Sequence, residues 1–151
     1  NFIKADIQAN FWNGDPDIDA VCRMIHRPEC NFKKSYFPFY SNKISVFNSQ
    51  NTLLTRRTIR DYFLFPHIGR MDDIWASFYV TSKKYKVIYN VPTVYQQRNV
   101  HNLIKDFKDE YIGYVNSLNL VESLYKNSDN ITKFLPKKSS LAFDEWKKLI
   151  K

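Results

Sequence analysis

The sequence is poor in glycine and cysteine and has no long apolar run: its 151 residues include three glycines and two cysteines. Three isolated glycines exclude the glycine-rich phosphate loops of Rossmann and P-loop units. Two cysteines, Cys22 and Cys30, are too few for a disulfide scaffold or a zinc site, and their mutual pairing stays open. Without about 18 consecutive apolar residues, no membrane span is expected in this stretch.

The sequence also lacks an initiator methionine and a signal-peptide pattern, so we expect a piece of a longer protein. Hydrophobic residues make up 44% and charged residues 25%, which is typical of a globular domain and excludes low-complexity and disordered classes. At this length a single domain is the default.

The charge balance is basic, with a formal net charge of +8. This charge indicates either an ordinary basic surface or a polyanionic partner, such as nucleic acid or the diphosphate of a nucleotide-sugar. The basic residues form separated doublets rather than one cluster, which disfavours nucleic acid. Aromatic residues reach 17%, and those outside the core can stack on bases or sugar rings.

The best-defined local pattern predicts a helix from Pro16 to the residue before Pro28. Asp15 is the expected N-cap, and proline is favoured at the first helical position. Apolar residues follow Ile18 at i+3, i+4 and i+7, which makes one apolar helical face. Asp17 would then lie in the first turn, where the helix dipole favours negative charge.

The remaining patterns predict an α/β chain whose second half is mostly helical. Residues 1–11 show no clear period, and residues 31–43 resemble an aromatic loop. The expected strands cover 44–47 and 85–91. The expected helices cover 55–61, a segment from 72, a segment starting at Asn99 or His101 and broken at 128–130, and 140–151. Two or three strands are fewer than a complete doubly wound domain requires.

Two clusters of acidic residues are candidates for metal binding or catalysis. Asp15, Asp17 and Asp19 could hold a divalent cation beside a diphosphate, or could only cap a helix. Asp72 and Asp73 precede an apolar helix, where a carboxylate could bind a sugar hydroxyl or act as a general base. Adjacent residues point in different directions, so at most one of this pair should reach a substrate.

His101 is the histidine with the clearest candidate role. Its imidazole could bind a metal, or it could be a solvated side chain at a helix start. No serine lies in a pattern that indicates a hydrolase triad, and the zinc motifs H-E-x-x-H and C-x-x-C are absent from the sequence.

Four blocks in order resemble the STELLO-type glycosyltransferase-like proteins. They are NGDPDIDA at 13–20, FNSQNT at 47–52, GRMDDIWA at 69–76 and QRNVHNLIKDF at 97–107. The first and third also resemble the reversibly glycosylated polypeptides, or UDP-arabinopyranose mutases, through Pro-Asp-x-Asp-Ala and Gly-Arg-x-Asp-Asp-x-Trp-Ala segments. The resemblance covers about residues 10–110.

This resemblance implies the acceptor-side, C-terminal half of a GT-A-type glycosyltransferase fold, with a short mixed sheet and flanking helices. Residues 1–110 would form that half, and residues 111–151 a helical extension. The implied activity is transfer of a sugar from a nucleotide-sugar to a hydroxyl of a glycan or protein. The donor half with its Asp-x-Asp motif would lie upstream and could be this segment's partner. Both the Golgi lumen and the cytoplasm fit.

The resemblance also implies catalytic and metal-binding roles. Asp73 or Asp72 would contact the acceptor hydroxyl and serve as base. His101, and Asp17 as a further candidate, would bind Mn²⁺ or Mg²⁺ on the nucleoside diphosphate.

Substrate-binding roles follow from the same resemblance. Arg70 and Arg98 would offset charge on the departing diphosphate. Trp75 would stack on a sugar ring. Three neutral amides that both donate and accept hydrogen bonds would recognise hydroxyls: Asn48, Gln50 and Asn51.

Two alternatives stay open. One is a non-catalytic glycosyltransferase-like module that binds a protein or glycan. The other is a basic nucleic-acid-binding domain, whose affinity would fall steeply with salt.

Overall fold

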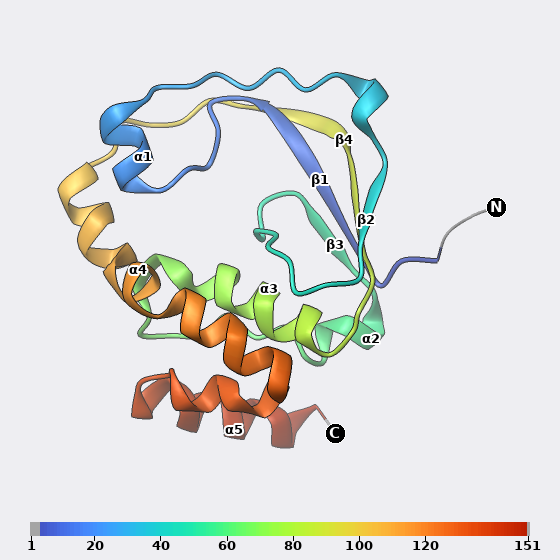
Figure 1. Cartoon of the computed structure of the whole chain (residues 1–151), viewed down its shortest axis with the longest axis vertical. Helices are drawn as coiled ribbons and strands as arrows, with labels where there is room; N and C mark the ends of the chain where they lie inside the picture. The colour runs from blue at the N-terminus through green and yellow to red at the C-terminus, as the bar shows by residue number, and fades with distance from the viewer. Residues whose placement is uncertain (1–3, 151) are drawn as a thin grey trace.

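A four-stranded mixed sheet forms one side of the molecule, and helices cover one of its faces (Figure 1). The computed structural model describes residues 4–150. The strand order is β2-β4-β1-β3. The strands are β1 (Ile7–Gly14), β2 (Phe39–Ser41), β3 (Thr52–Leu54) and β4 (Val87–Gln96).

The two central strands, β1 and β4, run parallel, and both edge strands are antiparallel to their neighbours. Parallel strands need a long crossover, and the segment between β1 and β4 contains α3. Alternate residues of the central strands, such as Ile7 and Val87, are fully buried. The β1–β4 register is interrupted between Asn10 and Trp12. Pro92 of β4 lies opposite this irregularity, where a missing N–H costs no ladder bond.

Five α-helices accompany the sheet in the described residues: α1 (Ala20–Ile25), α2 (Arg56–Ile59), α3 (Asp72–Ser82), α4 (Leu103–Lys126) and α5 (Lys137–Leu149). Helix α3 lies between the sheet on one side and α4 and α5 on the other (Figure 1). Its Trp75 and Tyr79 are almost fully buried, and Phe143 of α5 packs edge-on against Tyr79. Across residues 4–150, none of the helices combines the length and apolar character that crossing a membrane requires.

The predicted α/β class is confirmed, with a mixed sheet and flanking helices. The expected division at residue 110 falls within α4. Leu120, Leu124 and Phe143, from the expected extension, share one buried core with the sheet residues. Cys22 and Cys30 are both free thiols.

The predicted start of the first helix is wrong. Helix α1 begins at Ala20, and its N-cap is Asp19, whose side chain accepts a hydrogen bond from the Cys22 N–H. Asp15 instead forms an ion pair with Arg23 at 2.8 Å, and its N–H donates to the Gln96 carbonyl. The ion pair with nearby Arg23 and the backbone bond to distant Gln96 hold the Asp15-Pro16 pair outside the helix.

One strand prediction and one loop prediction also fail. Residues 44–47 form no strand, because the Ser45 N–H donates to the Thr81 hydroxyl of α3 instead of to a neighbouring strand. The expected aromatic loop at 31–43 contains β2, and β1 occupies residues for which no period was visible.

Several helix boundaries agree with the sequence patterns. Thr55 caps α2 as predicted. Helix α4 begins at Leu103 with Asn102 as its N-cap, slightly after the expected start. It ends at Lys126, and a 3₁₀ segment covers the predicted break. Helix α5 begins three residues before its predicted start.

Gly69 provides a stability prediction. It has a φ of +61°, and a Cβ there would lie 2.0 Å from the backbone oxygen of Asp109. We expect Gly69→Ala to lower the free energy of unfolding by about 2 kcal/mol or more, because the left-handed backbone alone costs about 1–2 kcal/mol. Gly113→Ala is the control: the three atoms nearest to its Cβ would belong to the flexible Met71 side chain, and no positive φ is required there. Urea unfolding should show a clearly larger loss for Gly69→Ala, and equal losses would contradict this account.

Candidate functional site

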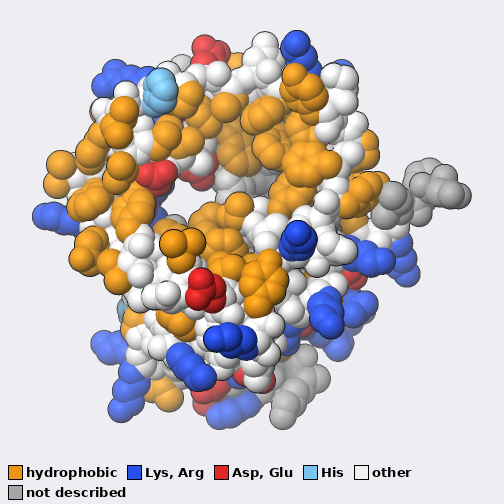
Figure 2. Space-filling view, in the orientation of Figure 1, with side chains coloured by type: hydrophobic (Ala, Val, Ile, Leu, Met, Phe, Trp, Pro, Cys, Tyr) orange, Lys and Arg blue, Asp and Glu red, His pale blue; other side chains and the backbone are white. Residues whose placement is uncertain are grey.

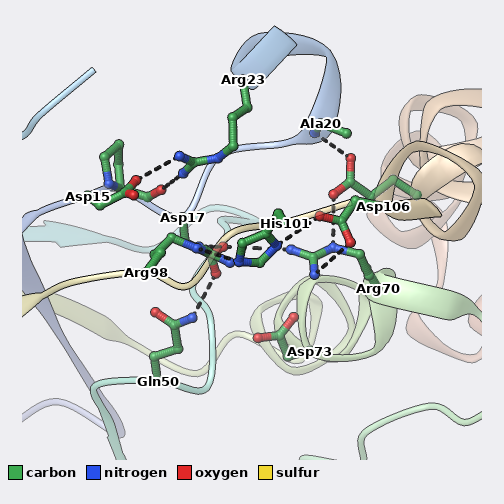
Figure 3. Close-up of polar contacts among 12 residues, drawn as sticks. Asp15, Asp17, Ala20, Arg23, Gln50, Arg70, Asp73, Arg98, His101 and Asp106 are labelled. Atoms are coloured by element: carbon green, nitrogen blue, oxygen red, sulfur yellow. Dashed lines mark hydrogen bonds and ion pairs between the residues drawn. The ribbon is translucent and has the colours of Figure 1, made fainter. Parts of the chain in front are cut away.

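The four sequence blocks, far apart along the chain, meet around the carboxylate of Asp17 (Figure 3). Gln50 donates its amide to Asp17 Oδ2 at 3.0 Å, and Arg98 donates to Asp17 Oδ1. Arg70 lies 3.9 Å from the same Oδ1. One residue from each block therefore takes part in a single polar cluster.

Arg70 connects this cluster to α4. Its Nε donates to Glu110 Oε1 at 3.0 Å, and another guanidinium nitrogen lies 3.6 Å from Asp106. Burial lowers the pKa of Arg70, but Asp106, Glu110 and Asp17 outweigh this effect and raise it above the usual value. Arg70 therefore stays charged, and its charge is matched by carboxylates of this chain.

Glu110 is almost fully buried and was not predicted as a site residue. Its Oε2 accepts hydrogen bonds from the Ala20 N–H at 2.7 Å and from the Tyr114 hydroxyl at 2.8 Å. Glu110 thereby joins the start of α1 to α4 and to Arg70. The sequence indicates a role for Glu110 only weakly, through its position one helical turn after Asp106.

His101 uses both ring nitrogens within the protein. Its Nδ1 lies 2.9 Å from Asp106, and its Nε2 accepts from Arg98 at 3.3 Å. Both oxygens of Asp17 are likewise engaged. Residues 4–150 contain no group of three or more acidic, histidine or cysteine side chains that could hold a metal. The donor set around Asp17 and His101 thus does not fit Mn²⁺ or Mg²⁺, because arginine side chains lie where a cation would bind.

Asp72 and Asp73 have different surroundings, as expected for adjacent helical residues. Asp73 Oδ2 accepts from the Ser49 N–H at 2.9 Å and from the Ser49 hydroxyl at 3.2 Å. Its Oδ1 has no partner among the described residues. Asp72 Oδ1 instead accepts from the Asp73 N–H, so it serves the first turn of α3.

Burial raises the pKa of Asp73 above its usual value, and the charges of Asp72 and Asp17 act in the same direction. Hydrogen bonds from Ser49 offset part of this rise. A carboxylate with a raised pKa is a stronger base once ionised, which is the property a general base requires.

Asp73 lines a cavity of about 310 Å³ between α3, α4 and the segment before α1. An adjoining cavity of about 220 Å³ shares Asp17 and Ile74 with it and reaches Trp12 and Asn48. We call the two together the cleft. Figure 2 shows the molecule hollowed in this region, with acidic side chains at the upper edge of the hollow and hydrophobic side chains on its other sides.

The cleft carries an excess of negative charge. Four carboxylates and one guanidinium line its larger cavity: Asp17, Asp19, Asp73, Glu110 and Arg70. A diphosphate would be repelled there, whereas a hydroxyl of a neutral compound can donate to Asp73 Oδ1.

The other predicted substrate residues are only partly in the cleft. Asn48 lines it, and Gln50 reaches it through Asp17. Asn51 instead donates to the Phe11 carbonyl and the Thr93 hydroxyl, so it joins the two central strands. Trp75 is fully buried and donates to the Ser117 hydroxyl at 3.0 Å, so the prediction that it stacks on a sugar is wrong.

The raised pKa of Asp73 predicts a pH-dependent stability. For an acid whose folded pKa exceeds its unfolded value, the folded state binds more protons between the two values, so stability falls as pH rises through them. We therefore expect Asp73→Asn to raise the melting temperature at pH 7, and this gain to vanish below the unfolded pKa of 3.8. Asp144→Asn, at an exposed carboxylate of α5, is the control. A destabilised Asp73→Asn protein at pH 7 would contradict the shift.

Comparison with known proteins gives little guidance. No family model matches the chain. The gamma-glutamyl phosphate reductase of Methanococcoides burtonii is similar at 23% identity over 119 residues, which cover 77% of this chain and 26% of that protein. The chain thus spans about a quarter of the length of this relative, and the identity is too low to assign a family.

Proposed function

We propose that the chain is the acceptor side of a GT-A-type glycosyltransferase, which transfers a sugar from a nucleotide-sugar to a hydroxyl group. The observation that carries the proposal is the convergence of the four blocks around Asp17 and the cleft. These blocks are the ones that resemble glycosyltransferase-like proteins. A shared functional site would explain why segments up to 81 positions apart meet in one hydrogen-bonded cluster.

The charge of the cleft supports the acceptor role rather than the donor role. Arg70 and Arg98 are engaged by carboxylates of this chain, so neither is available to neutralise a diphosphate. A neutral sugar hydroxyl, by contrast, can donate to Asp73 Oδ1, which has no partner among the described residues. The nucleotide-sugar would contact this cleft only through its sugar.

Asp73 is the residue best placed to act as base. In the proposed step the acceptor hydroxyl oxygen bonds to the anomeric carbon of the donor sugar. The bond from that carbon to the diphosphate oxygen breaks, and its electron pair leaves with the diphosphate. The hydroxyl proton passes to Asp73 Oδ1, while Ser49 holds Oδ2. The step uses no metal bound by Asp17 and His101, since their donor atoms are engaged.

A non-catalytic glycan-binding module is the second candidate, and a specific observation favours it. Arg70 and His101 are bound to groups of this chain, so they stabilise the walls of the cleft and need not take part in a transfer reaction. Both candidates bind glycan, but only the enzyme needs the Asp73 carboxylate as base. Nucleic acid is disfavoured at this cleft because its lining is mainly acidic.

Calorimetric titration of the chain tests the proposal. Neutral oligosaccharides should bind, and UDP- and GDP-sugars should bind more weakly than the matching free sugars. Asp73→Asn should weaken glycan binding, whereas Asp144→Asn should not. Absence of binding to every neutral glycan at millimolar concentration, or preferential binding of free nucleoside diphosphates, would overturn the acceptor role.

A further inference from the structure

The outward face of α4 is apolar where a surface helix is normally polar. Five of its large apolar side chains are between 52% and 82% exposed: Ile104, Tyr111, Val115, Leu118 and Tyr125. We call these five residues the α4 stripe. Figure 2 shows hydrophobic side chains over the region where Figure 1 places the first half of α4.

The spacing of the stripe is that of a helix-pairing seam. Ile104, Tyr111, Leu118 and Tyr125 recur every seven residues, and Val115 lies four residues after Tyr111. Apolar residues at alternating three- and four-residue steps keep one face toward a partner helix over several turns. The stripe runs along nearly the whole of α4, which at 1.5 Å per residue is about 36 Å long.

The two charged residues on this face indicate which helix would pair with it. Lys108 and Glu122 complete the same seam and lie seven residues before and seven after Val115. Both positions are exposed. A twofold axis at Val115 with antiparallel helices would place Lys108 opposite Glu122 of the partner subunit, and Glu122 opposite the partner subunit's Lys108. Parallel pairing would instead place like charges together.

The apolar residues fit the same symmetry to within one residue, or about 1.5 Å along the helix. Around that axis Tyr111 would lie beside Leu118 of the partner subunit, and Ile104 beside the partner subunit's Tyr125. Apart from the two charged levels, large apolar residues thus meet one another along the seam, and Val115 meets itself. A twofold interface requires this self-complementarity, in which one patch serves both subunits.

From these observations we propose that the α4 stripe is the interface of an antiparallel homodimer, with its twofold axis at Val115. The proposal does not depend on the glycosyltransferase assignment, because no stripe residue lines the cleft. A single helix pair buries less than the roughly 1,600 Å² of a standard interface. The dimer should therefore be weak and concentration-dependent.

Sedimentation velocity over a range of concentrations tests the dimer. Leu118→Lys should raise the dissociation constant about tenfold or more, since it places a charge in the seam. Leu149→Lys is the matched control, because Leu149 is equally exposed but lies on α5. A chain that stays monomeric up to several hundred micromolar, or a dimer equally sensitive to both substitutions, would overturn the proposal.

A charge swap and a cysteine cross-link test the orientation. Lys108→Glu alone should weaken the dimer, and the double variant Lys108→Glu with Glu122→Lys should restore it. Val115→Cys, in a chain whose natural cysteines are replaced by serine, should form an intersubunit disulfide under mild oxidation. Cross-linking at Leu149→Cys instead, or failure of the charge swap to restore a dimer, would contradict the antiparallel arrangement.

Discussion

Arg70→Met is expected to lower the free energy of unfolding by about 3 kcal/mol, the lower end of the range found when one partner of a buried ion pair is removed, because the Arg70 side chain is itself 33% exposed. The reason is Glu110, whose side chain is only 7% exposed and would lose its cationic partner. Asp106 and Asp17 would lose a neighbouring positive charge as well. Urea or thermal unfolding measures the loss.

Arg57→Met is the matched control for this prediction. The Arg57 side chain is 76% exposed and has one ion pair, with Asp6, at 3.8 Å. Exposed pairs of this kind contribute about 0–1 kcal/mol. If the two variants lost equal stability, the Arg70 cluster would not be the structural centre described above.

Asp73→Asn is expected to reduce sugar transfer by the full-length protein about 10²- to 10⁴-fold, because that is the usual contribution of a positioned general base. Asparagine can still accept a hydrogen bond from Ser49, so the loop over α3 should keep its place. Transfer of radiolabelled sugar from the nucleotide-sugar measures the effect. The variant should be at least as stable as the natural protein at pH 7, which separates loss of chemistry from loss of fold.

Asp72→Asn is the control for the transfer assay. Asp72 bonds within the first turn of α3 and does not line the cleft, so its loss should change transfer far less. Equal losses in the two variants would remove the reason for assigning the base to Asp73. Unchanged transfer in Asp73→Asn would favour the non-catalytic module.

The sequence predicted the parts of the fold that depend on local chemistry. An acidic first turn marks the start of α3, Thr55 caps α2, and the β-rich run before Pro92 begins β4. It failed where distant partners decide the structure. Asp15 lies outside the helix that it was expected to cap because its N–H donates to the Gln96 carbonyl while its carboxylate pairs with Arg23. No local period can reveal the contact with Gln96.

The candidate site was predictable to a similar extent. Asp73, Arg70 and Asp17 were identified from sequence blocks, and the structure brings them to one cleft. Glu110 was not identified, because its partners Arg70 and Ala20 lie 40 and 90 positions away. Trp75 was misassigned because an aromatic residue after two acids can face either a ligand or the core, and its neighbours on α3 and α4 decide for the core.

The most direct test of the central claim, that the acidic cleft beside Asp73 receives a glycan, is an NMR titration of the isotope-labelled chain with a neutral oligosaccharide. The account predicts saturable shifts at Ser49, Asp73 and Tyr114, with the α5 resonances unchanged. Shifts confined to surfaces away from these three residues, or no shifts at millimolar ligand, would contradict it.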